Sequence, residues 1–289
     1  MTPAEPADRG RIPDLPRIAG DSDAWNATGV TNGIDVPSGR ATPTWLRVPM
    51  FPVWATNILL GILVVVFIYE SYVGGSLAGS EQIDVLRKLG AKDNNLIVQG
   101  EYWRLITAMF LHAGFLHIAF NGYALLIFGQ QIERFYGWAR FLAVYFIAGL
   151  AGSIASFAFS PAISVGASGA IFGVMGAMGA FFWVQRRLLG AMARTQLWNA
   201  LTIIGINILF GLSQSGAIDN MAHGGGLIGG LIAGFALAPR YRPGRALGPD
   251  ERMLEDSLPR WAPIAVTVAL LAVELILFAV ALAYQKGHI

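Results

Sequence analysis

A serine and a histidine each stand at the beginning of a long, apolar, glycine-rich segment of this chain. Ser168 lies in the tetrapeptide Gly-Ala-Ser-Gly, and His223 lies in the sequence Ala-His-Gly-Gly-Gly. A serine hydroxyl next to an imidazole is a nucleophile with its general base. Apolar segments of membrane proteins retain polar groups mainly for function. The two residues therefore predict a catalytic pair, provided that their segments meet in space.

A third apolar segment carries His117 and Asn121, whose spacing of four places both on one face of a helix. Such side chains could donate hydrogen bonds to an oxyanion, or they could simply satisfy loop carbonyl groups. His223 taken alone could also make a structural hydrogen bond or line a transport pathway. His112, five residues before His117, is expected to organise the preceding loop.

The composition indicates a polytopic membrane protein. Of the 289 residues, 55% are hydrophobic and only 13% are charged, with a mean hydropathy of +0.55. A soluble domain carries about 25% charged residues. The net charge of +2 is too small to suggest a nucleic-acid partner, and the absence of cysteine excludes disulfides, thiol catalysis and thiolate metal sites.

Other hydrolytic chemistries find no support in the sequence. It contains no His-Glu-x-x-His pattern for a metalloprotease, and the apolar segments contain no aspartate for a paired-aspartate protease. We therefore expect neither a metal nor another cofactor.

Seven apolar runs are long enough to cross a bilayer as helices. They lie near residues 53–73, 115–133, 138–159, 168–185, 197–213, 221–239 and 261–284. The predicted organisation is a disordered cytoplasmic tail at 1–47, a core of six membrane helices at 48–240, a cytoplasmic linker at 241–260, and a seventh helix with a short outer end at 261–289.

The distribution of lysine and arginine predicts the orientation. Fifteen of the twenty fall in the tail and in the loops that follow spans two, four and six. By the positive-inside rule the N-terminus is cytoplasmic. Spans two, four and six then descend from the outer face, so His117, Ser168 and His223 should lie at similar depth.

Small residues recur at every fourth position of spans four and six, a spacing that lets helix backbones approach closely in lipid. These residues are Gly169, Gly173 and Ala177 in span four, and Gly226, Gly230 and Gly234 in span six. We therefore expect the two helices that carry Ser168 and His223 to pack against each other.

Two acidic residues receive non-catalytic interpretations. Glu133, with Arg134, is expected at a solvated helix end. Glu274 lies in the middle of span seven, where a carboxylate facing lipid is costly. It should therefore face the helical core. Its role should be structural, because it lies about ten residues, or about 15 Å, below the outer end of its helix, and so well below His223.

With these residues in view, the chain resembles the rhomboid family of intramembrane serine proteases. The resemblance covers about residues 50–240 and depends on five motifs in the family's order. They are Glu101-Tyr102-Trp103-Arg104, His117-Ile118-Ala119-Phe120-Asn121, Glu133-Arg134-Phe135-Tyr136-Gly137, Gly166-Ala167-Ser168-Gly169 and Ala222-His223-Gly224-Gly225-Gly226.

The resemblance implies an all-α polytopic fold with a six-helix core and an appended seventh helix. It implies Ser168 as nucleophile and His223 as general base, with the Ser168 backbone N–H, Asn121 and His117 holding the oxyanion. Gly169 would keep the approach to the nucleophile open, and Phe172 would lie against the histidine.

The resemblance also implies the partners: the lipid bilayer and transmembrane protein substrates, cut near their outer end after a small residue. Substrates would enter beside span five, under a cap formed by residues 213–219. The protein would be integral to a bacterial cell membrane, with the site open to the outer face. Two alternatives, a protease-dead chaperone and a transporter using the intramembrane His and Asn groups, would leave Ser168 dispensable.

Overall fold

The computed structural model describes residues 45–213, 218–248 and 251–287. These residues form two units, which are described separately. The larger unit is helical and contains the described residues of 50–241 and 256–287. The smaller unit contains residues 45–49 and the described residues of 242–255. The predicted disorder of the tail at 1–44 lies outside the described residues.

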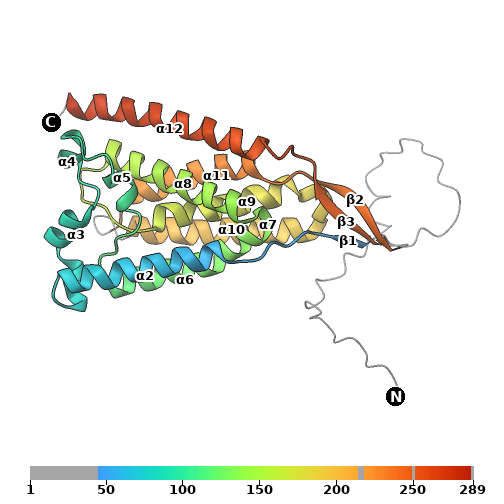
Figure 1. The fold of residues 1–289 in the computed structure, drawn as a ribbon, viewed down its shortest axis with the longest axis horizontal. Coiled ribbons are helices and arrows are strands. Elements are labelled where there is room, and N and C mark those ends of the chain that lie inside the picture. Colours follow the sequence, from blue (N-terminus) through green and yellow to red (C-terminus); the bar gives the residue numbers. More distant parts are fainter. Residues whose placement is uncertain (1–44, 214–217, 249–250, 288–289) are drawn as a thin grey trace, which may run out of the picture. The chain divides into compact units, whose positions relative to one another are not determined.

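The larger unit contains a helix at each predicted membrane span (Figure 1). Span two is divided into three pieces, because a π-helical stretch interrupts it and α7 then continues the same path. The elements are α2 (Ala55–Val73), α6 (Phe115–Ala124), η2 (Leu125–Gly129), α7 (Gln130–Tyr136), α8 (Trp138–Phe159), α9 (Ser168–Val184), α10 (Arg186–Ser213), α11 (Asn220–Leu237) and α12 (Ala262–Lys286).

Four of these helices, α2, α8, α10 and α12, are long and apolar enough to cross a membrane by length and composition. Helix α9 is apolar but has only 17 residues. The mostly helical, apolar architecture agrees with the predicted all-α polytopic fold.

The loop between α2 and α6 is not irregular. It contains η1 (Leu77–Glu81), α3 (Ile83–Leu89), α4 (Asn94–Val98) and α5 (Arg104–Thr107). Arg104 organises this region, because its buried guanidinium donates to the carbonyl groups of Arg87 and Ala91, at 2.7 and 3.0 Å, and pairs with Glu101.

The arginine-rich segment expected as a loop before span five is helical. Helix α10 already begins at Arg186, directly after α9. Its path bends at Gly190, which has φ 52° and ψ −127°. Glycine adopts such a positive φ without the steric cost that a Cβ imposes. The bend therefore changes the direction of the chain between α9 and span five, without the longer irregular loop that the sequence predicted there.

The segment expected as a plain linker at 241–260 contains two strands, β2 (Tyr241–Gly248) and β3 (Glu251–Asp256). With β1 (Trp45–Arg47), they form a sheet of order β1-β3-β2, in which β1 runs parallel to β3. Residues 45–47 thus belong to a strand and not to a disordered tail. Pairing between segments from opposite ends of the sequence leaves no local signal in either of them.

Glu133 is fully buried, contrary to its expected place at a solvated helix end. Its carboxylate accepts the backbone N–H groups of Trp54, Ala55 and Thr56 at 2.7–2.9 Å, and the Thr56 hydroxyl at 2.7 Å. The first N–H groups of a helix have no partner within the helix. Glu133 therefore caps α2 and ties that helix to α7.

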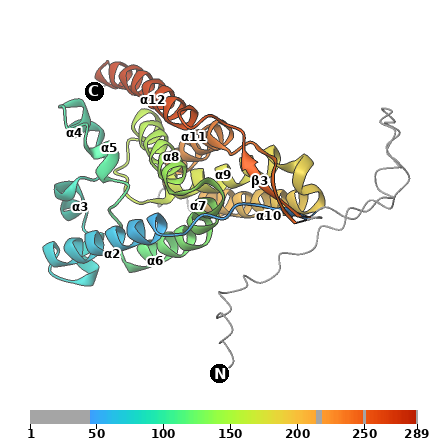
Figure 2. The same ribbon diagram turned by 45° about the vertical axis from the view of Figure 1, so that its right-hand side comes forward.

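Helices α8, α9 and α11 lie side by side in both views (Figures 1 and 2). Between α9 and α11 the expected small residues meet as pairs. A Cβ added at Gly226 or Gly230 would collide with the backbone of Gly169 or Gly173, and one at Gly234 would lie 2.5 Å from the Cα of Ala177. The predicted close packing of these helices is thus present along three successive turns.

Helix α12 packs against α8 and, to a smaller extent, α11. Near its end, the Gln285 amide donates to the carbonyl groups of Phe157 and Ala158 at 2.9 and 3.1 Å. Glu274 is 5% exposed, so it faces the helical core as expected. Its Oε2 atom has no hydrogen-bond partner among the described residues.

Candidate active site

Ser168 and His223 are in direct contact. The Nε2 atom of His223 lies 2.8 Å from the Oγ atom of Ser168. Ser168 is the first residue of α9 and His223 is the fourth residue of α11. Because the two helices cross at their glycines, their first turns bring these side chains together. The contact places an imidazole nitrogen where it can accept the hydroxyl proton.

Phe172, one turn after Ser168, braces the imidazole. Its ring stacks on that of His223 with centroids 4.3 Å apart and an angle of 17° between the planes. The phenyl ring is 6% exposed, so its own position is held by packing. A flat contact of this kind limits rotation of the histidine about its Cβ–Cγ bond.

The chain turns sharply before Ser168 at Gly166, which has φ +123°. Its N–H donates to the carbonyl of Ala108 at 2.9 Å. A Cβ at this position would lie 2.7 Å from Nε2 of His117 and 3.7 Å from the Ser168 hydroxyl. The glycine thus leaves room for His117 to approach the head of α9.

Asn121 is buried in α6 at 6% exposure, and its amide donates to the carbonyl of His117 at 2.8 Å. An asparagine amide has two N–H groups. One therefore remains for another acceptor.

Gly169 has the consequence expected of a small residue on the packing face of its helix. A Cβ at this position would lie 3.2 Å from the carbonyl oxygen of Ala222 on α11. The missing side chain makes room for the neighbouring helix, and so for the approach of His223.

Asp219, the residue before α11, has a role beyond its place in the predicted cap at 213–219. Its Oδ1 atom accepts the N–H of Ala222 at 3.0 Å, and its Oδ2 atom accepts the Ser156 hydroxyl. Its backbone carbonyl accepts the N–H of His223 at 3.1 Å. Aspartate is common at the N-cap, the residue before the first helical turn, where its side chain accepts the N–H of the second or third helical residue. The position of Asp219 three residues before Ala222 was therefore an available signal.

A residue that was not predicted at the site is Glu70, a carboxylate within the apolar helix α2. It is fully buried, and its two oxygens accept the N–H of His112 at 3.1 and 3.2 Å. An acidic residue inside a membrane span is itself a signal for a polar partner. Glu70 fixes the chain five residues before His117.

His112 organises the loop as expected and also contacts the site. Its Nδ1 atom lies 3.2 Å from the carbonyl of Phe110, and its ring packs edge-on against the His117 ring at 5.1 Å. Burial lowers the pKa of His112 to about 3, and the neighbouring His117 acts in the same direction. The His112 imidazole is therefore neutral at pH 7.

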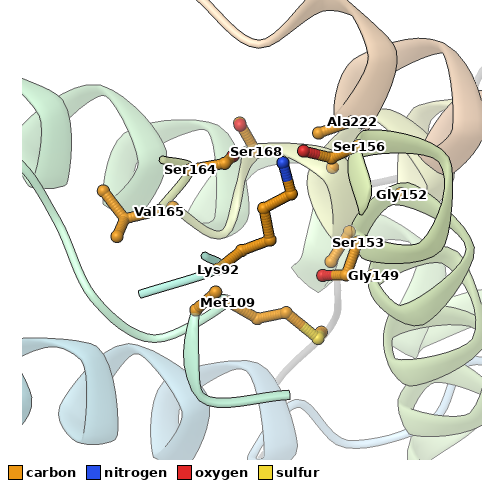
Figure 3. A pocket seen from close by; sticks show the side chains of 14 residues that line it. Lys92, Met109, Gly149, Gly152, Ser153, Ser156, Ser164, Val165, Ser168 and Ala222 are labelled. Carbon is orange, nitrogen blue, oxygen red and sulfur yellow. The ribbon is translucent and has the colours of Figure 1, made fainter. Parts of the chain in front are cut away.

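A small cavity of about 20 Å³ adjoins Ser168, enough for roughly one water molecule. Lys92, Met109, Ser153 and Ser156 are among the side chains that line it (Figure 3). The Ser168 hydroxyl thus borders polar surface that comes from α8 and from the loop between α2 and α6, residues 74–114, which we call the first loop.

Known proteins provide an independent comparison. The Rhomboid domain family matches residues 99–240. The rhomboid protease GluP of Bacillus subtilis is 50% identical over 159 residues, which are 55% of this chain and 31% of that protein. The mitochondrial RHOMBOID-like protein 6 of Arabidopsis thaliana is 44% identical over 161 residues, covering 55% of this chain and 52% of that protein.

The chain thus spans about a third to a half of the length of these two relatives. A shorter Bacillus subtilis relative, YdcA, is 38% identical over 141 residues, which make up 48% of this chain and 69% of that protein. The segment that matches the family, residues 99–240, contains the motifs around Ser168 and His223. This chain therefore belongs to the rhomboid family and is an integral membrane protein.

Proposed function

We propose that this protein is an intramembrane serine endopeptidase in which Ser168 is the nucleophile and His223 the general base. The observation that carries the proposal is the 2.8 Å contact between His223 Nε2 and Ser168 Oγ. The names of its relatives support it, since GluP is called a rhomboid protease.

In this mechanism Nε2 of His223 accepts the Ser168 proton as the hydroxyl oxygen attacks a substrate carbonyl. The imidazolium then donates that proton to the leaving amine, and an acyl-enzyme remains on Ser168. A water molecule, deprotonated by His223, hydrolyses the ester and restores the free serine. Phe172 keeps the imidazole in line through both proton transfers.

The oxyanion would be held at the beginning of α9. The Ser168 N–H belongs to the first turn of the helix, where N–H groups lack a helical partner and the helix dipole favours negative charge. The His117 ring lies next to this turn, and Asn121 retains one amide N–H. Together these groups could supply three donors.

The substrate class in this proposal is a transmembrane segment of another protein, cut near its outer end. The cytoplasmic N-terminus, the bacterial cell membrane and the opening of the site to the outer face are part of the same proposal. They depend on the arginine distribution and on the family. The predicted cap at 213–219 includes residues 214–217, which lie outside the described residues. Substrate entry beside α10 is consistent with the sparse burial of that helix.

The test is cleavage of a panel of single-span substrates by the purified protein in detergent. A fluorophosphonate probe should label Ser168 in the wild type and should fail to label Ser168→Ala. Both Ser168→Ala and His223→Ala should abolish cleavage, because each removes one partner of the proton transfer.

The control is Ser257→Ala, at an exposed position between β3 and α12 and outside the Ser168–His223 pair, which should retain cleavage. Thermal unfolding of each variant must match the wild type within a few degrees. Cleavage by well-folded Ser168→Ala would refute the protease assignment. It would leave the chaperone and transporter alternatives, neither of which needs this hydroxyl.

A further inference from the structure

The first loop contributes a buried cation to the surroundings of the dyad. Lys92 lies between α3 and α4, yet its side chain is only 1% exposed and lines the cavity beside Ser168. In Figure 3 its head points toward the end of the cavity where Ser156 and Ser168 lie. Lysine is almost never fully buried unless it is paired, so its partners indicate what it does.

Lys92 holds the segment that delivers the nucleophile. Its ammonium donates to the carbonyl groups of Ser160 and Ala162 at 2.6 and 2.9 Å. Its backbone exchanges two further hydrogen bonds with Ser164, at 3.0 and 3.1 Å. Segment 160–167 leads directly into α9, so four hydrogen bonds from one residue set the approach to Ser168.

Asp219 has the corresponding role for the general base. It caps α11 through Ala222, accepts the N–H of His223 on its carbonyl, and accepts the Ser156 hydroxyl. The aspartate thus sets the first turn of the helix that presents the imidazole.

Lys92 and Asp219 approach each other at Ser156, which lines the same cavity as Lys92 and donates its hydroxyl to Asp219. Burial lowers the pKa of Lys92 to about 8, and the negative charges of Asp219 and Asp93 oppose that shift. Asp93 is engaged by Arg87 at 2.8 Å. Segment 160–167 contains no charged residue, and the polar side chains of α8 that line the cavity, Ser153 and Ser156, are uncharged. Attraction between charges in low-dielectric surroundings acts beyond direct contact.

We propose that Lys92 and Asp219 are a pair of positioning residues, whose opposite charges couple the loop before Ser168 to the helix that carries His223. This inference rests on the proposed function, because it assigns how the first loop keeps that dyad assembled. Neither residue touches the reacting atoms. Each acts through the backbone of the segment that presents one member of the dyad.

The test compares three variants with the wild type. Lys92→Met keeps an unbranched stem and removes the ammonium, whereas Asp219→Asn removes the charge and keeps a side chain that caps helices equally well. The third variant combines both changes. Lys88→Met and Asp84→Asn, at exposed positions of α3, are the matched controls. The measurements are kcat, KM and the rate of fluorophosphonate labelling.

We expect Lys92→Met to lower kcat about tenfold, with little change in KM, and Asp219→Asn to lower it by a smaller factor. The kcat of the double variant should lie within about twofold of the kcat of Lys92→Met, since the effects of coupled residues are non-additive. The labelling rate of the wild type should fall as the pH rises through about 8, where Lys92 loses its proton. Lys92→Met should show no such fall. A histidine of ordinary pKa, about 6.5, is already neutral in this range.

If the wild type is active and both single variants have the same rates as the wild type, the coupling is refuted and the proposed function stands. Strictly multiplicative effects in the double variant would do the same. A wild type that neither cleaves nor reacts with the probe would instead refute the proposed function, and this inference with it. If Lys92→Met fails to fold, Asp219→Asn and the wild-type pH profile decide, and a flat profile with an unaffected Asp219→Asn refutes the pair.

Discussion

Helices α9 and α10 follow each other in sequence but are packed in opposite ways. Every residue of α9 from Gly169 to Phe182 is buried. In α10, which is eleven residues longer, the described buried positions are Leu189, Ala193, Ala200 and Gly211. Large side chains such as Trp198 and Leu209 point outward, 62% and 69% exposed.

The difference shows where the fold needs precision. In lipid, helices gain little from burying apolar side chains and pack tightly where small residues allow backbone contact. The α9–α11 contact uses this route and bears Ser168 and His223. Helix α10 keeps its large side chains for lipid, so few close contacts fix its position against α11.

The strongest test of this contrast is a larger side chain at Gly226. Gly226→Val would drive two methyl groups into the backbone of Gly169, which cannot move without displacing Ser168. We expect loss of at least about 3 kcal/mol of stability, the upper end of overpacking effects, and loss of cleavage. Thermal unfolding in detergent and kcat measure both.

The control for this variant is Gly205→Ala on α10, where an added Cβ meets nothing within 4 Å. It should keep full activity and unfold at the wild-type temperature or slightly above it. Equal destabilisation by the two changes would remove the distinction between the two helices.

A smaller effect is expected at Phe172. Phe172→Leu removes the ring that stacks on His223 and keeps most of the apolar volume. Aromatic pairs contribute about 0.5–1.5 kcal/mol beyond area burial, so kcat should fall by about two- to tenfold with KM nearly unchanged. Phe210→Leu, at a position 59% exposed on α10, should leave kcat unaltered. An equal kcat for Phe172→Leu and the wild type would show that the stacking does not position the base.

Tyr136 joins α9 and α11 further along these helices than Ser168 and His223. Its hydroxyl lies 3.2 Å from the carbonyl of Ala177 on α9 and 2.9 Å from that of Gly234 on α11. Tyr136→Phe should cost about 1 kcal/mol, the usual net contribution of one hydrogen bond, and should reduce kcat only slightly. Tyr123→Phe, on the exposed face of α6, is the control for thermal unfolding. No difference between the two variants would mean that the bridge contributes nothing.

The smallest effect is expected at Glu274 on α12, away from the α9–α11 contact. Glu274→Gln preserves size and hydrogen-bonding capacity, so kcat should stay within about twofold of the wild type. Glu274→Leu should change the thermal unfolding temperature more than kcat, since a buried polar group affects stability chiefly through its own desolvation. A loss of activity in Glu274→Gln as large as in His223→Ala, at unchanged stability, would contradict the structural role.

Local patterns in the sequence were enough to place the helices and to identify Ser168, His223, His117 and Asn121 as candidates. Hydrophobic length and the four-residue spacing of glycines are properties of single segments, so they are visible without a structure. The place predicted for Glu133 was wrong, because the three N–H groups that it caps lie nearly 80 residues earlier in the chain. The strand pairing of β1 with β3 and the part played by Asp219 were not predicted either.

The sequence by itself determined the membrane-spanning helices, the small-residue faces and the residue types able to perform serine chemistry. Only the tertiary structure decided that His223 Nε2 meets Ser168 Oγ at hydrogen-bonding distance. It also brought Lys92 of the first loop into the surroundings of the dyad. The physical reason is that helix formation depends on neighbours in sequence, whereas hydrogen bonds between α9, α11 and the first loop depend on a helix crossing that no single segment encodes.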